Sequence, residues 1–472
     1  MSSSSRWAKI EALSSSIILV RIKSVHHHPT FYLCRMAGNK KDEKAILDKF
    51  GIKALNPMQE AAHKAIRKES EVVLLSPTGT GKTLAFLLPL LDELDPKLKA
   101  VQALILLPSR ELAIQVEQVF REMGSGYKAN AVYGGRSGYK DRMEIQHPPT
   151  VLIGTPGRVA DHMRNGNLDM TLVKTLILDE FDKSLEVGFE DEMKKIIVGL
   201  PALKKKILTS ATEKVKIPPF VGIKKATRLD FLKNNNVQLQ IISVVSPDRN
   251  KFNTLVQLLK YNTHGNGIIF CNLKDSIQKV SDALTRDKID HACFYGGLEQ
   301  LDRERALIKF RNGTHRLLVA TDLAARGIDV PAMDFIVHYE LPPTEDEFVH
   351  RNGRTARMKT EGTAYVLRWK QETLPEFIKG AEEISPRSTK EEKVRKWKTL
   401  YITGGRKDKI SKSDIAGLFF KQGKLTQEEL GVIELKQDCS YVSVVSTKYK
   451  ELIETLNNSR LKKKKVRISL LE

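Results

Sequence analysis

Short apolar runs alternate with stretches of helical periodicity along most of this chain. In the first half, continuous apolar runs mark strand candidates at residues 72–75, 103–107, 129–133, 150–155, 175–180 and 206–212. Most of the segments between them place apolar residues at helical spacing. Continuous apolar runs are typical of strands that are covered on both faces. The pattern therefore predicts a mostly parallel sheet packed between helices.

Two further blocks follow, and only the first of them repeats this alternation. Its strand candidates are residues 267–272, 291–297, 316–322, 335–341 and 363–369. The last block places strands at 399–403, 431–435, 440–445 and 465–470, with helices from Ser411 and over 448–457. A strand, helix, strand, strand, helix, strand order is that of the RNA-recognition-motif fold. We predict an α/β chain with two parallel-sheet lobes and a small α+β domain.

Polar or charged segments separate the three blocks. Residues 231–250 contain an Asn run and a proline and are predicted to be a linker, and residues 379–398 a charged linker. The predicted domains are residues 36–230, 251–378 and 399–472. Residues 1–35 fit none of these blocks, and Met36 begins a sequence typical of a natural start. We therefore expect residues 1–35 to be a disordered extension or a segment that is not made.

Composition favours a soluble protein with a polyanionic partner. The chain has 472 residues, 41% hydrophobic and 29% charged, and a formal net charge of +21. That charge suggests nucleic acid, although a generally basic surface is the alternative. No apolar run approaches the roughly 20 residues that a membrane span needs. Four scattered cysteines argue against a zinc site or disulfide framework and favour a reducing cytoplasm.

Residues 76–83, SPTGTGKT, carry the first candidate chemistry because they link a predicted strand to a predicted helix. Ligands of parallel sheets bind beyond the carboxyl ends of strands, and loop amides at a helix N-terminus suit a phosphate. Lys82 would reach the terminal phosphates and Thr83 would bind Mg²⁺. Ser76 stands where the usual motif begins with glycine, and a plain Gly-rich turn is the alternative. The nucleotide-binding candidates are Ser76, Thr78, Gly79, Thr80, Gly81, Lys82 and Thr83.

Two charged clusters could complete this chemistry. Asp179 and Glu180 end a predicted strand, where one carboxylate would hold Mg²⁺ and the next would polarise the attacking water. An ordinary acidic pair at a strand end is the alternative. Residues 350–357, HRNGRTAR, space arginines three apart, so one could stabilise the charge of a transferring phosphoryl group. A generic RNA-facing surface is the other interpretation of that segment.

Together these motifs resemble the DEAD-box RNA helicases over about residues 50–369. The matching segments are NPMQ ending at Gln59, SPTGTGKT, PSREL (108–112), Gly134-Gly135, TPGR (155–158), DEFD (179–182), SAT (210–212), FCN (270–272), QLDR (300–303), ATDLAARGID (320–329) and HRNGRTAR. The departures from the family are few. They are Phe181 in place of Ala, Ser109 in place of Thr, Asn352 and Ala356 in the arginine motif, and Asp42 where an adenine-stacking aromatic is common.

The resemblance implies two RecA-like lobes that close around ATP, Mg²⁺ and single-stranded RNA. It implies that Gln59 reads adenine and Asp179 binds the metal, that Lys82 and Glu180 are catalytic, and that Ser210 and Thr212 couple the sites. The second lobe would contribute Asp329, Arg354 and Arg357. RNA contacts, mainly to the sugar-phosphate backbone, would come from Arg110, Gly135, Thr155, Arg158, Arg303 and Thr321.

The last block is similar to the RNA-binding domain of DbpA-type helicases, through residues 401–419 and the two strands after them. This resemblance implies that the domain binds structured 23S ribosomal RNA and tethers the core to it. From Tyr401 onward there are 15 Lys and Arg against 9 Asp and Glu. Tyr401 and Tyr441 are the candidates for base stacking, and the basic loops at 406–407 and 462–465 are the alternative binding surface.

We interpret the chain as a cytoplasmic, monomeric, ATP-dependent RNA helicase that acts in assembly of the large ribosomal subunit. One alternative is an ATP-locked RNA clamp that does not unwind. Another is a general mRNA-remodelling helicase of cold adaptation or decay. Strand displacement on a short duplex would separate the helicase from the clamp, because both need the same residues.

Overall fold

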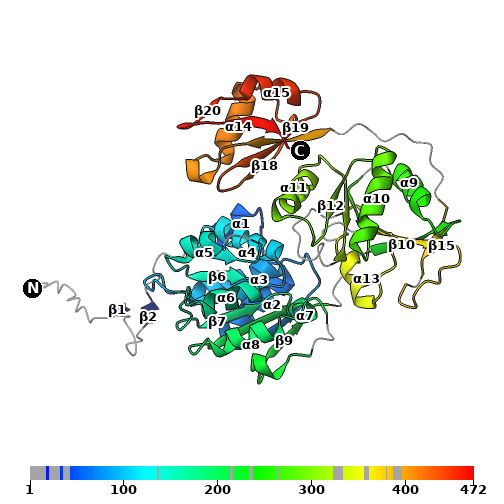
Figure 1. Cartoon of the computed structure of the whole chain (residues 1–472). Coiled ribbons are helices and arrows are strands. Elements are labelled where there is room, and N and C mark those ends of the chain that lie inside the picture. The colour runs from blue at the N-terminus through cyan, green and yellow to red at the C-terminus, as the bar shows by residue number, and fades with distance from the viewer. Residues whose placement is uncertain are drawn as a thin grey trace, which may run out of the picture.

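The computed structural model describes residues 17–20, 32–35, 43–135, 138–212, 216–232, 238–262, 265–322, 333–355, 361–378, 380–385 and 396–471. Figure 1 shows two α/β lobes and a smaller third domain that stands beside α11 of the second lobe. No helix among the described residues is long and apolar enough to cross a membrane.

Lobe 1 is built on a seven-stranded parallel sheet in the order β5-β6-β4-β7-β8-β3-β9. Its strands are β3 (Glu71–Leu75), β4 (Ala103–Leu106), β5 (Ala129–Val132), β6 (Val151–Gly154), β7 (Thr175–Leu178), β8 (Lys205–Ser210) and β9 (Thr227–Asp230). Its helices are α1 (Glu43–Lys49), α2 (Pro57–Lys68), α3 (Lys82–Glu93), α4 (Arg110–Met123), α5 (Gly138–Ile145), α6 (Pro156–Arg164), α7 (Phe181–Glu186) and α8 (Glu190–Val198). Separate hydrophobic clusters cover the two faces of the sheet, as the continuous apolar runs predicted.

Lobe 2 repeats this architecture with the parallel order β12-β13-β11-β14-β15-β10-β16. Its strands are β10 (Gln238–Ser246), β11 (Gly267–Phe270), β12 (His291–Phe294), β13 (Leu317–Ala320), β14 (Phe335–His338), β15 (Glu361–Trp369) and β16 (Glu382–Ile384). Its helices are α9 (Phe252–Tyr261), α10 (Lys274–Arg286), α11 (Gln300–Arg311) and α13 (Glu345–Asn352).

The predicted linkers are shorter than the sequence suggested. Residues 238–246 form β10, which pairs with β15 and β16 inside the second sheet, so the linker expected over 231–250 was wrong there. The preceding Asn run favoured a linker, and the partners of β10 lie more than a hundred residues later in the chain, so the local pattern did not indicate the strand. Likewise β16 lies within the expected charged linker at 379–398 and forms an edge of the sheet.

The third domain has the predicted α+β order. An antiparallel sheet β18-β19-β17-β22 is formed by Leu430–Leu435, Ser440–Val445, Trp397–Ile402 and Ile468–Leu470. Helices α14 (Lys412–Lys421) and α15 (Tyr449–Leu456) pack on one face of it. A short hairpin of β20 (Arg460–Leu461) and β21 (Lys464–Lys465) precedes the last strand.

Near the N-terminus, β1 (Ile17–Val20) and β2 (Tyr32–Arg35) pair antiparallel. The other residues of 1–35 lie outside the described residues, so the expected disordered or absent extension stays a prediction. A start at Met36 stays a prediction.

Candidate nucleotide site and RNA cavity

The phosphate-binding loop lies between β3 and α3, at the carboxyl end of a buried strand. Lys82, the first residue of α3, is buried, and its Nζ donates to the backbone oxygens of Ser76 at 2.6 Å and Pro77 at 3.0 Å. Burial lowers the pKa of Lys82, and the nearby carboxylates of Glu180 and Asp179 oppose that shift. The ammonium group therefore lies in the loop and among the acids that the resemblance assigned to the same site.

Hydrogen bonds within the loop explain how it tolerates Ser76. The Ser76 hydroxyl lies 2.8 Å from the Thr80 hydroxyl, and Thr80 Oγ1 donates to Pro77 O at 2.9 Å. Gly81 has a φ of +88°, and a Cβ there would lie 2.5 Å from Nε2 of Gln59. Gln59 in turn donates to Gly81 O at 3.2 Å. Gln59 thus contacts the phosphate loop, while its reading of adenine stays a prediction.

The acid pair follows β7 directly, as the sequence predicted. Asp179 is buried and accepts a hydrogen bond from Thr209 Oγ1 at 2.5 Å. Glu180 has a φ of +48°, a left-handed conformation that costs a non-glycine residue of order 1–3 kcal/mol, and its N–H lies 3.1 Å from Asp179 Oδ1. Burial raises the pKa of both carboxyls. Backbone strain and buried acids together are typical of a functional site.

The donor set fits a magnesium ion. Carboxylate and hydroxyl oxygens are the ligands that Mg²⁺ prefers, and Asp179 and Thr83 would supply them. A divalent cation would also offset the cost of burying the Asp179 carboxylate in this position.

The predicted coupling residues connect β8 to the acidic segment. Ser210 Oγ donates to Thr212 O at 2.9 Å, and Thr212 Oγ1 donates to Asp182 Oδ2 at 3.1 Å. Movement of residues 210–212 would therefore shift Asp182 and with it the start of α7, beside Glu180. Their role in coupling stays a prediction.

Lobe 2 reaches the nucleotide site through the loop after α13. Thr78 Oγ1 donates to Gly353 O at 3.3 Å across the two lobes. The next residue, Arg354, is buried, and its charge acts on Lys82 and Glu180. Arg354 therefore lies near these two charged groups, while its predicted role in stabilising a transferring phosphoryl group stays a prediction. Arg357 and Asp329 lie outside the described residues.

Arg351, three residues earlier, has a structural role. It is buried, its Nε donates to Asp322 Oδ1 at 2.7 Å, and its other nitrogens bond Glu340 O at 2.8 Å and Asn272 Oδ1 at 2.7 Å. The departure at Asn352 is also accommodated, because its Oδ1 lies 3.1 Å from Nε2 of the buried His338.

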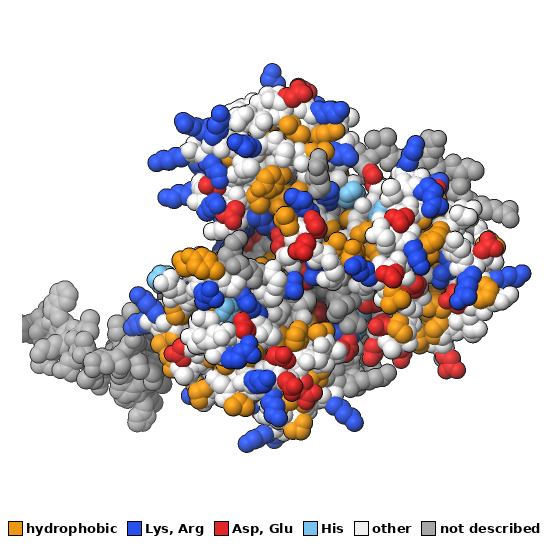
Figure 2. Space-filling model, viewed as in Figure 1, with side chains coloured by type: hydrophobic (Ala, Val, Ile, Leu, Met, Phe, Trp, Pro, Cys, Tyr) orange, Lys and Arg blue, Asp and Glu red, His pale blue; other side chains and the backbone are white. Residues whose placement is uncertain are grey.

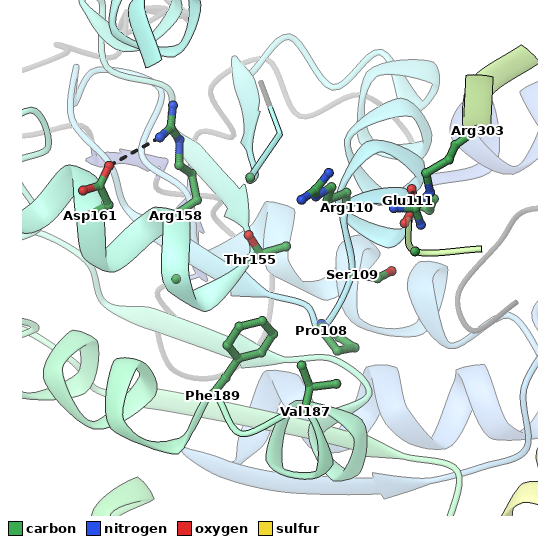
Figure 3. Close-up of a pocket in the computed structure, with 13 residues that line it drawn as sticks. Pro108, Ser109, Arg110, Glu111, Thr155, Arg158, Asp161, Val187, Phe189 and Arg303 are labelled. Carbon is green, nitrogen blue, oxygen red and sulfur yellow. Dashed lines mark hydrogen bonds and ion pairs between the residues drawn. The ribbon is translucent and has the colours of Figure 1, made fainter. Parts of the chain in front are cut away.

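A cavity of about 560 Å³ lies between the lobes and gathers four of the predicted RNA-binding residues (Figure 3). These four are Arg110, Thr155, Arg158 and Arg303. Figure 3 shows Arg303 entering from lobe 2 toward Glu111, and the two side chains form an ion pair at 2.9 Å. The cavity therefore depends on both lobes. Thr321 follows β13 and does not belong to the described lining of this cavity.

Gly135 is required beside Arg110. It has a φ of +78°, and a Cβ there would lie 2.2 Å from Nη1 of Arg110. Gly135 thus leaves room for the arginine side chain; direct contact with RNA stays a prediction.

Sequence reasoning missed several residues of the cavity. Val187 and Phe189 line it from the segment after α7, and Asp161 pairs with Arg158 at 3.4 Å. Asp141 on α5 is fully buried, and its Oδ2 accepts from Arg158 Nε at 2.8 Å. Nothing in the local pattern marks Asp141, because its partner lies 17 residues away on another helix.

Comparison with known proteins agrees with this geometry. The DEAD/DEAH box helicase family matches residues 56–217, the helicase conserved C-terminal domain 250–359, and the DbpA RNA-binding domain 399–470. The ATP-dependent RNA helicase DbpA of Bacillus subtilis (strain 168) is 31% identical over 468 residues, covering 90% of this chain and 96% of that protein. DbpA of Escherichia coli (strain K12) is 32% identical over 445 residues, with the same coverage.

Solved structures show the same core. Saccharomyces cerevisiae Dbp5 bound to RNA and ADP BeF3 is 27% identical and has a TM-score of 0.61, covering 69% of this chain and 88% of that chain. Mss116p bound to single-stranded RNA and AMP-PNP shares the fold, with a TM-score of 0.64 at 24% identity, covering 73% of this chain and 78% of that chain.

The two RecA-like lobes, which match the DEAD/DEAH box and helicase C-terminal families, define an ATP-dependent RNA enzyme. The chain belongs to the DEAD-box ATP-dependent RNA helicases, and within them to those that carry a DbpA RNA-binding domain.

Proposed function

We propose that this chain couples RNA-stimulated ATP hydrolysis to local separation of short RNA duplexes during assembly of the large ribosomal subunit. One observation supports the proposal: both candidate sites receive residues from lobe 2. Gly353, beside Arg354, accepts a hydrogen bond from Thr78 of the phosphate loop, and Arg303 pairs with Glu111 in the cavity. Closure of the lobes therefore affects both ligands at once.

At the nucleotide site, each residue has a defined task in the hydrolysis. Lys82 and the loop amides bind the phosphates, and Glu180 orients the attacking water and accepts its proton. Arg354 offsets charge on the transferring phosphoryl group. Bound Mg²⁺, held by Asp179 and Thr83, would neutralise phosphate charge.

In the cavity, arginines and amides contact the sugar-phosphate backbone of one strand. Such contacts carry little sequence information, so target choice must come from elsewhere. A strand held here and bent by lobe closure would lose pairing with its partner locally. This mechanism separates short duplexes without movement along the RNA.

Target choice is assigned to the third domain, which would bind structured 23S ribosomal RNA through its basic loops. Figure 2 shows Lys and Arg side chains gathered on this domain. Lys462, Lys463 and Lys465 are exposed around the turn of the β20–β21 hairpin. Lys462 pairs with Asp414 at 2.9 Å, whereas no ion pair is described for Lys463 or Lys465. We place the enzyme in the cytoplasm as a monomer.

The test is ATP hydrolysis by the full chain alone, with unstructured RNA and with 23S ribosomal RNA, alongside strand displacement from a short duplex. Selective stimulation by ribosomal RNA together with displacement, both lost in Glu180→Gln, is the expected result. Hydrolysis without displacement would favour an ATP-locked RNA clamp. Equal stimulation by every RNA would favour a general mRNA-remodelling helicase. No stimulation by any RNA would refute the proposal.

A further inference from the structure

The third domain contacts lobe 2 through one face of its sheet. Along β17 and β19 successive side chains alternate between two faces. Leu400, Ile402, Val442 and Val444 point into the domain's own core beneath α14 and α15. The other face carries Tyr401 and Tyr441, and Tyr441 is only 4% exposed because it clusters with Ile308 of α11. Tyr441 is therefore unavailable for base stacking in this arrangement.

An ion pair between Arg311 and Glu434 stabilises the edge of the contact between lobe 2 and the third domain. Arg311, the last residue of α11, donates from Nε to Glu434 Oε1 at 2.8 Å and from Nη2 to Oε2 at 2.7 Å. Burial pushes the pKa of Glu434 up, but hydrogen bonds and charge from Arg311 hold it below its usual value. A bidentate pair of this kind fixes orientation as well as distance.

Buried polar groups and close packing extend the contact along the sheet. The hydroxyls of Thr314 and Thr399 lie 2.7 Å apart, and both residues are buried. Ser443 Oγ donates to Asn312 O at 2.8 Å. A Cβ on Gly313 would lie 3.1 Å from Cδ1 of Trp397, so the indole packs directly on that turn. Buried polar groups satisfied across an interface favour one arrangement over others.

One helix joins this interface to the RNA cavity. Arg303 lies near the start of α11 and faces the cavity, whereas Arg311 ends the same helix and faces the third domain. Eight residues of α-helix span about 12 Å. The cavity and the docked domain are therefore connected by a rigid element.

We propose that Arg311 and Glu434 are specificity-determining residues, because they fix the third domain on lobe 2 and so set which duplex the cavity can reach. RNA held by the exposed hairpin would be presented at one distance and orientation. A flexible tether would instead raise the effective concentration of all nearby duplexes. The inference rests on the proposed function, in which this domain binds structured ribosomal RNA.

The test measures displacement of short complementary strands annealed at different positions along full-length 23S ribosomal RNA. The intact chain should displace strands at a few positions much faster than at the rest. Arg311→Glu, Glu434→Arg and the milder Glu434→Gln should reduce this preference, by about tenfold for the charge reversals. The double exchange Arg311→Glu with Glu434→Arg should restore it. Glu383→Arg is the matched control, because Glu383 pairs with Arg368 at the opposite edge of the lobe 2 sheet.

A second measurement reports docking without RNA. Spin labels at Lys279 of lobe 2 and Lys450 of the third domain, in a chain with its cysteines replaced by alanine, should give a narrow distance distribution. The distribution should broaden in Arg311→Glu and narrow again in the double exchange. Hydrolysis stimulated by unstructured RNA should stay unchanged in all variants, because neither residue lies at the nucleotide site.

The two measurements separate the possible failures. A broad distribution in the intact chain, or a positional preference unchanged by the charge reversals, would overturn the inference. If the intact chain displaces strands equally at all positions, both the ribosomal target and the specificity role are refuted. If the spin-label distances are then still narrowly distributed, and narrow again in the double exchange, the docking holds and the proposed function is wrong.

Discussion

The two lobes have the same sheet and differ in what their loops carry. If the strands of each lobe are numbered one to seven in chain order, their order across the sheet is 3-4-2-5-6-1-7 in both lobes. Yet only lobe 1 has a phosphate loop after its first strand, SPTGTGKT after β3. After β10, lobe 2 instead has the segment 247–251, PDRNK. The common architecture therefore sets positions, and the residues at those positions set the chemistry.

Two lysines illustrate this difference. Lys82 and Lys251 both lie at the start of the helix after the first strand, and each is 8% exposed. Lys82 lies among the acids of the nucleotide site. Lys251 donates to Leu367 O at 3.0 Å and pairs with Glu372 at 3.4 Å. We predict that the first lysine binds phosphate, whereas the second bonds within its own lobe.

The residues after the fifth strand show the same division. Glu180 follows β7 and faces the nucleotide site, whereas Glu340 follows β14 and accepts hydrogen bonds from Asn272 N and Ser276 Oγ, both at 2.6 Å. We expect Glu180→Gln to reduce kcat for RNA-stimulated hydrolysis by about 10²–10⁴-fold, since the water loses its base. Glu340→Gln should instead cost about 1–3 kcal/mol of stability.

Steady-state hydrolysis and urea unfolding of the two variants would check this pair. RNA binding in the presence of ATP should survive in Glu180→Gln. The different roles assigned to Glu180 and Glu340 would be contradicted if Glu340→Gln lowered kcat as much as Glu180→Gln and left the urea unfolding midpoint unchanged.

The two lysines give a second, smaller contrast. Lys82→Ala should lower kcat/KM for ATP by about 10²-fold, because a charge aimed at the phosphates is lost. Lys251→Ala should leave kcat/KM close to normal and destabilise the chain by about 1–3 kcal/mol, since Leu367 O and Glu372 lose their partner. Hydrolysis rates and thermal unfolding distinguish these results, and equal loss of activity in both variants would contradict the assignment.

Acid should destabilise lobe 2 through its buried histidines. Burial lowers the pKa of His338 to about 3 and that of His315 to about 4, against an ordinary value of 6.5. Below pH 6.5 the unfolded chain binds these protons and the folded chain does not. The contribution of these histidines to the free energy of unfolding is therefore fully present above pH 6.5. It falls as the pH drops toward the pKa values of the folded chain, by about 1.4 kcal/mol for each histidine and each pH unit.

Denaturant unfolding at neutral pH and near pH 5 measures this slope. Replacing both histidines with glutamine should flatten it, whereas replacing the exposed His147 of lobe 1 should not. An unchanged slope in the double variant would exclude these two groups as its source.

The smallest expected effect concerns the loop itself. Ser76→Gly restores the usual motif but removes the hydrogen bond to Thr80, so the change in free energy should stay near or below ~1 kcal/mol. KM for ATP should accordingly change by less than about fivefold, which a titration of initial rates would detect. A loss as large as that of Lys82→Ala would show that Ser76 has a more direct role.

The sequence predicted most of the buried strands, because their apolar runs are continuous. It missed β9 and β16, which lie at sheet edges and are partly exposed, and β10, which follows an Asn run. At the sites, loop motifs of local spacing predicted residues that the structure places around one loop, such as Lys82, Asp179 and Glu180; their roles stay predictions. Asp141, the Arg303–Glu111 pair and the docking of Tyr441 depend on contacts between distant segments, which periodicity does not encode.

The paired arginines of the cavity have a consequence for how RNA binding responds to salt. Arg303 already holds Glu111, and Arg158 already holds Asp141. A phosphate that enters here exchanges one anion for another, and few new cationic groups are neutralised. Since salt dependence scales with the number of phosphates newly neutralised, RNA affinity should fall less steeply with ionic strength than the arginine count suggests.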